Sequence, residues 1–315
     1  LRAALLKLRP DDHILICTMH HIISDAWSAG VFVRELAGNY EAFSRRIDYR
    51  PEPLQFQYGD STIWQREYSH SDIFQRQLEY WKKKLVGSPP VLKLPYDHPR
   101  PPGRTSEGWS QTIRLDPALA GRLKVIAQDN GATFFILMLT AFNVLLYRYT
   151  AEPDILIGVP VAGRNHVETE SLIGLFVNTL VLRTDLSGNP RFSTLLAQVR
   201  DTMLEALANQ AVPLEKIVQE LQPVRSLSYN PVFQVMFATF KGAVRSRSFG
   251  DLKASPYVIN TATSRLDLSA ALIEGTDGHW WIQLEYSTAL FDHDRILRLL
   301  GHYEQLLCSI ARTIP

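Results

Sequence analysis

Length, composition and charge narrow the class of protein first. The chain has 315 residues, enough for about two domains, and 46% of them are hydrophobic, enough for substantial cores. Its 33 basic and 32 acidic side chains give a formal charge of +1, so there is no electrostatic drive toward nucleic acid or an anionic membrane. The two cysteines are too few for a disulfide framework, which favours a reducing cytoplasm, and no apolar run is long enough to span a bilayer.

The first part of the chain is expected to contain one strand and two helices. An apolar run that ends at Met19 predicts a buried strand over residues 13–19. Helical spacing follows from about Trp27 to Phe43, with an apolar stripe of Phe32, Leu36, Tyr40 and Phe43. A second helix has Ser71 as its cap and an apolar stripe of Phe74, Leu78, Trp81 and Leu85.

A segment rich in proline and glycine separates this part from the rest. Residues 86–108 contain six prolines and three glycines, which interrupt any helix or central strand. We place a domain boundary within this segment, between residues 1–98 and residues 99–315. Beyond it, strands are expected near 109–115, 154–161, 175–183, 232–240, 266–273 and 280–287, and helices near 117–129, 133–149, 191–208, 213–221 and 292–310. This alternation predicts a mixed α/β chain.

The residues that point most directly to chemistry form the stretch Met19-His20-His21-Ile22-Ile23-Ser24-Asp25-Ala26-Trp27-Ser28. Histidine is the side chain best suited to moving protons near neutral pH. Because neighbouring side chains on a strand point to opposite faces, one imidazole would face a cleft and the other would be buried support. Core histidines, a metal site and a solvated loop are alternative interpretations. The metal site is disfavoured, because adjacent strand residues diverge and no further ligand cluster stands out.

Five segments, taken together, resemble a known family. They are His20–Asp25, Tyr58–Gln65, Ile157–Arg164 with Ile173–Thr179, Asn209–Glu215 and Arg225–Phe237. They are similar, in the same order, to the motifs of condensation domains from nonribosomal peptide synthetases. Ala26 stands where that family usually has glycine, and Asn209 where it more often has histidine. The resemblance covers essentially the whole chain. It implies an α/β fold of two chloramphenicol acetyltransferase-like lobes, with mixed sheets flanked by helices and the active site in the channel between the lobes.

The resemblance also implies how the chain divides. Family members carry two further motifs upstream of the histidine pair, whereas this chain starts at Leu1, just before it. We therefore expect residues 1–98 to be the C-terminal part of an incomplete N-terminal lobe, and residues 99–315 to be the C-terminal lobe. Apolar surface that has lost its cover weakens a fold, so residues 1–85 are expected to be less stable than residues 109–315.

The activity implied by the resemblance is amide-bond formation. The amine of an aminoacyl group on one carrier protein attacks an acyl or peptidyl thioester on another. His21 is the expected catalytic residue, either as general base or by holding the amine in line. His20 is expected to be buried support. Backbone N–H groups between Ser24 and Ala26 are candidates to steady the oxyanion.

The remaining candidates support this motif. In the family, the residue matching Asp25 is structural and paired with an arginine, and Arg164 is the candidate partner here. Orientation of the imidazole by Asp25, as in a catalytic triad, is the alternative. Further channel or motif candidates are Ser24, Ser28, Asn178 and Asn230, and the two asparagines also suit plain turn roles. The resemblance implies no cofactor and no metal bound by the domain itself.

The implied partners are other parts of the same assembly line. They are an upstream donor and a downstream acceptor peptidyl carrier domain, which hold substrates on phosphopantetheine arms, and an adjacent adenylation domain, all in the cytoplasm. Two alternatives stay open. One is an epimerisation domain on the same scaffold, although its distinctive acidic motif has no equivalent at Pro160–His166. The other is a non-catalytic domain that binds carrier proteins or partner enzymes.

Overall fold

The chain divides into two compact units. The computed structural model describes residues 1–48, 51–89, 91–224, 226–241, 247–255, 257, 259–275 and 277–314. Arg225, which belongs to the last of the five matched segments, therefore lies outside the described residues. The smaller unit comprises residues 1–74, 161–178 and 243–259, and the larger unit comprises residues 75–160, 179–242 and 260–315.

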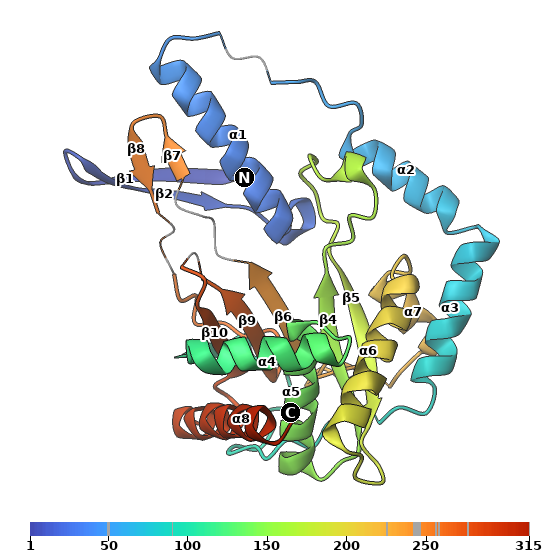
Figure 1. Ribbon diagram of the computed structural model, residues 1–315. Helices are drawn as coiled ribbons and strands as arrows, with labels where there is room; N and C mark the ends of the chain where they lie inside the picture. Colours follow the sequence, from blue (N-terminus) through green and yellow to red (C-terminus); the bar gives the residue numbers. More distant parts are fainter. Residues whose placement is uncertain are drawn as a thin grey trace. The chain divides into compact units, whose positions relative to one another are not determined.

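The larger unit is built on a mixed six-stranded sheet (Figure 1). Its strands, in spatial order, are β3 (Gly108–Arg114), β10 (Trp280–Ser287), β9 (Leu268–Glu274), β6 (Val235–Lys241), β4 (Asp154–Val161) and β5 (Asn178–Asp185). β10 pairs antiparallel with β3 and β9, whereas β6 pairs in parallel with β9 and β4. Residues 155–159 of β4 are all buried, as a strand covered on both faces should be.

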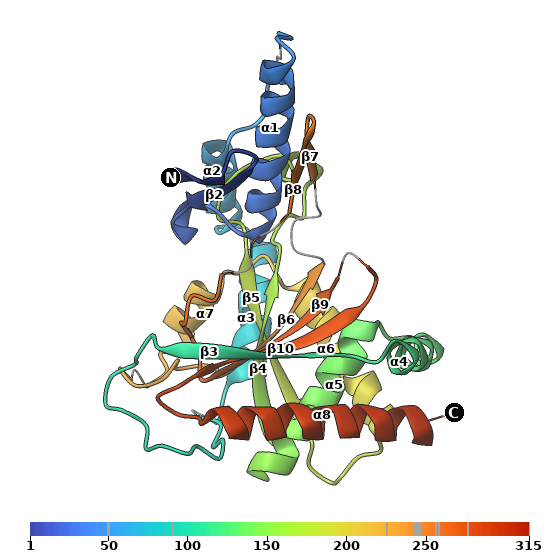
Figure 2. The ribbon, with the colours of Figure 1, turned by 90° about the vertical axis from the view of Figure 1, so that its left-hand side faces the viewer.

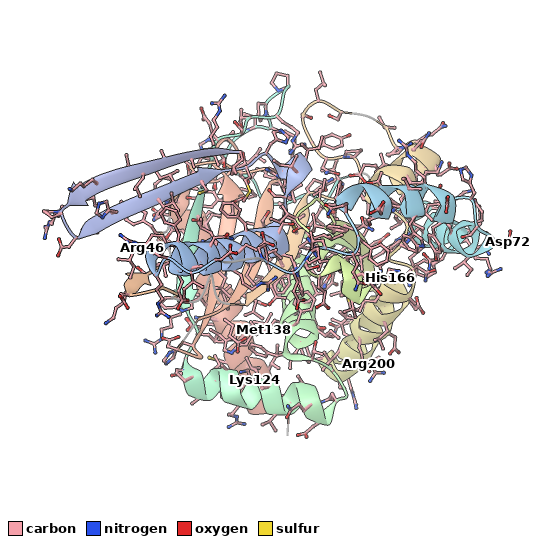
Figure 3. All side chains as sticks on the ribbon, turned by 90° about the horizontal axis from the view of Figure 1, so that it is seen from above. Arg46, Asp72, Lys124, Met138, His166 and Arg200 are labelled. Carbon is pink, nitrogen blue, oxygen red and sulfur yellow. The ribbon has the colours of Figure 1, made fainter. Side chains whose placement is uncertain are left out.

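Helices complete the core of this unit. They are α3 (Asp72–Leu85), α4 (Pro117–Asp129), α5 (Phe134–Thr150), α6 (Phe192–Ala208), α7 (Leu214–Leu221) and α8 (His293–Thr313). α5 contacts α4, α6 and α8, and α8 also lies against β3 and β10 (Figure 2). The nearly continuous apolar sequence of α5 fits this burial, and Thr133 caps it by accepting a hydrogen bond from the Ile136 N–H at 3.2 Å. Lys124 and Met138 mark α4 and α5 in Figure 3.

The smaller unit has less regular structure. Its elements are β1 (Arg2–Arg9), β2 (Asp12–Thr18), η1 (His21–Ile23), α1 (Ala26–Ser44), α2 (Tyr58–Tyr68), η2 (Val167–Thr169), β7 (Arg247–Phe249) and β8 (Leu252–Ala254). β1 and β2 form an antiparallel two-stranded sheet, and β7 and β8 form another. α1 lies beside β7, where the Tyr40 and Phe249 rings meet edge to face at 6.2 Å.

The expected mixed α/β fold is confirmed, but some local expectations are wrong. The strand predicted over residues 13–19 exists as β2, yet it is largely exposed, because in the described part of the chain it pairs with β1 alone. The buried residues of α1 are Ser28, Val31, Ala37 and Ala42 rather than the predicted apolar stripe, of which Phe43 is 87% exposed. The elements β1, α2, β7 and β8 were not expected from the sequence.

The unit boundaries differ from the expected domain boundary at residue 98, because residues 75–98 belong to the larger unit. Trp81 of α3 is fully buried there, and its indole N–H donates to the Asn209 carbonyl oxygen at 2.9 Å. Arg183 of β5 donates to the carbonyl oxygens of Lys84 and Val86, at 3.1 and 2.8 Å, and so fixes the end of the helix. These contacts outweigh the proline-rich composition of the segment that follows.

No single helix in the described ranges is long and apolar enough to cross a membrane, and one pair, α4 and α5, passes that test only together, with a bend of 100° between the two helices.

Candidate active site around His21

The polypeptide leaves strand geometry just before the histidine pair. β2 ends at Thr18, and His21 opens the short 3₁₀ helix η1 that leads into α1. The His21 Nδ1 atom lies 2.7 Å from the Ser24 carbonyl oxygen, which can only accept a hydrogen bond. In the neutral ring the proton therefore sits on Nδ1, and Nε2 keeps its lone pair. His21 is exposed, so this basic nitrogen is available to a substrate.

His20 does not take the buried position that was expected. It is exposed, and its Nδ1 accepts a hydrogen bond from the Ile22 N–H at 3.0 Å, which caps η1. The expectation relied on strand alternation between His20 and His21. Since β2 has already ended at Thr18, that alternation does not apply.

Asp25 is a buried helix cap. Its Oδ1 accepts from the Ser28 N–H at 2.7 Å and its Oδ2 from the Phe176 N–H at 3.0 Å, while Arg164 Nη2 lies 3.3 Å from Oδ1. Burial alone would raise the pKa of the Asp25 carboxyl. The hydrogen bonds from Ser28 and Phe176 and the charge of Arg164 oppose that effect and lower the pKa below its usual value.

These contacts bear on the alternative role of Asp25. Among the contacts of the described residues, none joins the Asp25 carboxylate to His21, and the imidazole is held by the Ser24 carbonyl instead. The geometry therefore favours a structural role for Asp25 over imidazole orientation of the triad type.

Arg164 is the partner expected for Asp25, and the ion pair is present. Its side chain is 1% exposed, and its guanidinium lies 4.1 Å from the centre of the Phe176 ring. Nη1 donates to the carbonyl oxygens of Thr169 and Leu172, and Nη2 also donates to the Ser28 hydroxyl at 2.9 Å. The arginine thus ties the start of α1 to residues 161–178 of the same unit.

The second matched segment packs against the same loop. The Tyr58 hydroxyl donates to the Leu175 carbonyl oxygen at 3.0 Å, and the Tyr58 ring meets Phe176 edge to face at 5.2 Å. A Cβ atom on Gly174 would lie 2.1 Å from the Tyr58 ring, so only glycine fits there without movement. Trp64 stacks on Tyr68 and touches His166, which Figure 3 labels.

Three residues of the matched segments, Gly163, Gly174 and Phe176, had no expected role and prove to shape the site. Gly163 has a φ of +65°, and a Cβ there would lie 1.9 Å from the Phe176 carbonyl oxygen. Their place in matched segments was the only signal in the sequence, because the contacts that explain them link residues far apart along the chain.

The other candidates are distributed as follows. Ser24 is buried, and its N–H donates to the His21 carbonyl at 3.3 Å, so this N–H is not free for an oxyanion. Ala26 is the exposed first residue of α1, and Asn178 begins β5. Asn230 belongs to the larger unit, where its Oδ1 accepts from the Val232 N–H at 3.1 Å in a plain turn.

No group of three or more His, Cys, Asp or Glu side chains among the described residues is arranged to hold a metal ion. The chemistry of the cluster is therefore that of an exposed imidazole beside a buried ion pair.

Comparisons with known proteins agree with the motif geometry. The linear gramicidin synthase of Brevibacillus parabrevis is 45% identical, in one of its subunits, over 99% of this chain. Chondramide synthase cmdD of Chondromyces crocatus is 42% identical over 99% of this chain. The chain spans 6% and 8% of the length of these relatives.

Solved structures have the same fold. The X-domain from teicoplanin biosynthesis is 29% identical, with a TM-score of 0.90 over 99% of this chain and 72% of that chain. A complex of that X-domain with OxyB also matches, with a TM-score of 0.87. The family model for the condensation domain matches residues 1–314, and the chain therefore belongs to the condensation domain family.

Proposed function

We propose that this chain is the amide-forming condensation domain of a nonribosomal peptide synthetase, with His21 at the reacting centre. The observation that carries the proposal is the His21 ring itself. Its Nδ1 is held by the Ser24 carbonyl at 2.7 Å, and its Nε2 is left as an exposed base. That ring lies in the motif of a family whose model spans residues 1–314.

The proposed reaction is aminolysis of a thioester. The amine nitrogen of a carrier-bound aminoacyl group attacks the carbonyl carbon of an acyl or peptidyl thioester, and a C–N bond forms. His21 Nε2 accepts the proton that the attacking nitrogen loses, the C–S bond breaks, and the proton is returned to the departing thiolate. General-base assistance contributes roughly 10²–10⁴-fold to such a rate, and positioning of two tethered substrates contributes as much or more.

Carrier domains are the proposed partners. Both substrates would reach His21 on phosphopantetheine arms of a donor and an acceptor carrier domain, with an adenylation domain adjacent, in the cytoplasm. The curated relatives support this arrangement, because they are synthases in which the matching region is 6% and 8% of the length. The domain itself is proposed to need no cofactor.

A second candidate function is binding of a partner enzyme. It is favoured by the likeness to the teicoplanin X-domain, whose complex with OxyB has been solved. In that case His21 and the Asp25–Arg164 pair would be structural remnants. The intact geometry of the histidine turn supports catalysis over this candidate.

Reconstitution tests the proposal directly. The full-length synthetase that contains this chain would be supplied with a donor carrier bearing an acyl thioester and an acceptor carrier bearing an aminoacyl thioester. Mass spectrometry of the acceptor carrier should show the amide product. Inversion of the donor α-carbon without an amide would indicate an epimerisation domain, and absence of both reactions would favour the binding function.

A further inference from the structure

We infer that Ser28 is a positioning residue for the condensation reaction. Its hydroxyl fastens the Gly174 loop, defined as residues 172–176, to the first turn of α1, directly after the histidine motif. The catalytic part of this inference rests on the proposed amide-forming function. The structural part, a clamp between the loop and the helix, stands on the geometry alone.

The Ser28 hydroxyl is fully used. A serine hydroxyl has one donor and two acceptor sites. Here it donates to the Gly174 carbonyl oxygen at 2.7 Å, and it accepts from the Gly174 N–H at 3.1 Å and from Arg164 Nη2 at 2.9 Å. Ser28 is 0% exposed, so no water can replace these bonds if the hydroxyl is removed.

The clamp holds both polar groups of a single loop residue. Because the N–H and the C=O of Gly174 both bind one hydroxyl, the peptide backbone at this point is fixed in rotation as well as in distance. On its other side the loop is covered by Tyr58, whose hydroxyl binds the Leu175 carbonyl at 3.0 Å. The loop is therefore held from two sides, and Ser28 supplies the side that belongs to the motif helix.

A chain of bonds connects this clamp to the imidazole. Asp25 Oδ1 caps the Ser28 N–H, Asp25 Oδ2 binds the Phe176 N–H, and the Ser24 carbonyl holds His21 Nδ1. Residues 21–28 and the Gly174 loop thus form one hydrogen-bonded body. Loss of the Ser28 hydroxyl should loosen the loop while the contacts of His21 itself remain, and turnover should fall because the imidazole and the loop no longer keep a fixed relation.

The test compares Ser28→Ala with Ser28→Cys in the full-length synthetase. Cysteine keeps the size of serine but is a weak hydrogen-bonding group, and it provides a second variant if alanine at this position prevents folding. Thr140→Val is the matched control. Thr140 is also 0% exposed, and its hydroxyl donates to the Ile136 carbonyl at 2.7 Å, but it lies within α5 of the larger unit.

Three quantities are measured: hydrogen exchange of peptides that cover residues 172–176, the melting temperature, and kcat and KM for amide formation. In Ser28→Ala, exchange in the Gly174 loop should rise and kcat should fall, each by at least about tenfold, because two backbone groups and a guanidinium lose a buried partner. KM for the acceptor carrier should change little, and Ser28→Cys should fall between alanine and wild type. Thr140→Val should lower the melting temperature with kcat unchanged.

Unchanged exchange in the Gly174 loop of Ser28→Ala would overturn the clamp. A loosened loop with wild-type kcat would overturn the positioning role, and so would an equal loss of kcat in Thr140→Val. A wild-type synthetase that forms no amide refutes the proposed function and, with it, the positioning role. An active wild type with an unaffected Ser28→Ala variant refutes the positioning role alone.

Discussion

At the scale of single residues, the Asp25–Arg164 pair is organised for structure. Both side chains are almost completely buried, and taking two charges out of water is costly unless further hydrogen bonds satisfy them. Here the carboxylate receives two backbone N–H groups, and the guanidinium reaches two carbonyl oxygens and a hydroxyl. The pair therefore fixes the turn beside His21, and its removal should affect folding as well as turnover.

Asp25→Asn is the corresponding prediction. Breaking a buried pair typically costs about 3–5 kcal/mol, so the variant should lose stability of that order at pH 7. The folded-state pKa of Asp25 lies below its ordinary value, so its ionisation stabilises the fold above the unfolded pKa of about 3.9, and this stability is lost as pH falls through the folded pKa. Denaturant unfolding at pH 7 and below pH 4 should therefore show a smaller difference between wild type and variant at the lower pH.

Asp116→Asn provides the control for this experiment. Asp116 is also a helix N-cap, accepting from the Leu119 N–H at 2.9 Å, but it is exposed, and asparagine caps helices equally well. This variant should unfold like the wild type. Loss of activity in Asp25→Asn with an unchanged unfolding curve would instead indicate a direct catalytic role for Asp25.

The site shows what single residues reveal in advance. The pairing of Asp25 with Arg164, 139 positions apart, was accessible because both lie in motifs whose family pattern includes an arginine partner. The exposed position of His20 was not accessible, because it depends on β2 ending at Thr18 and on a 3₁₀ turn that has no apolar periodicity. The role of Ser28 depends on Gly174, which only the folded chain brings near.

At the scale of elements, helices that bury a regular stripe were predictable and the others were not. α3 was predicted with its cap and stripe because Phe74, Leu78, Trp81 and Leu85 are all buried. α2 was missed because it has no buried residue and is held by its motif aromatics instead. In α1 the apolar spacing predicted the helix correctly but not its buried face, since small residues such as Ala37 and Ala42 form that face.

The contact between α2 and the Gly174 loop gives an element-scale prediction. Gly174→Ala places a Cβ atom 2.1 Å from the Tyr58 ring, so the helix or the loop must shift and the melting temperature should fall. Overpacking of this kind typically costs about 1–3 kcal/mol. Gly121→Ala is the control, because Gly121 lies in α4 with nothing within 4 Å of an added Cβ, and alanine there should stabilise the helix by roughly 0.5–1 kcal/mol. Equal effects at both glycines would show that Tyr58 does not press on the loop.

At the scale of the whole molecule, the two units have very different cores. The buried apolar residues of the smaller unit are Val31, Ala37, Ala42, Phe74 and Leu172. The larger unit buries a six-stranded sheet and α5 among three other helices. Since burial of apolar surface is the main stabilising term of a fold, the smaller unit should open more often.

Hydrogen exchange on this chain should show that difference. Amides of β1, β2 and α1 are expected to exchange faster than those of α5 and β9, because local opening exposes little apolar surface in the smaller unit. Exchange measured by mass spectrometry, peptide by peptide, resolves the two units. Uniformly slow exchange across both would mean that the smaller unit is stabilised by interactions other than burial within its described residues.

The central claim is that His21 is the reacting imidazole of an amide-forming domain, and one measurement tests it most directly. Amide formation is measured in the full-length synthetase with wild type, His21→Ala and His13→Ala, where His13 is an exposed histidine of β2 outside the motif. His21→Ala should lower the rate by at least roughly 10²-fold with an unchanged melting temperature, because a base and a positioning contact are lost together. His13→Ala should retain the wild-type rate. Near wild-type turnover in His21→Ala would contradict the assignment of this site.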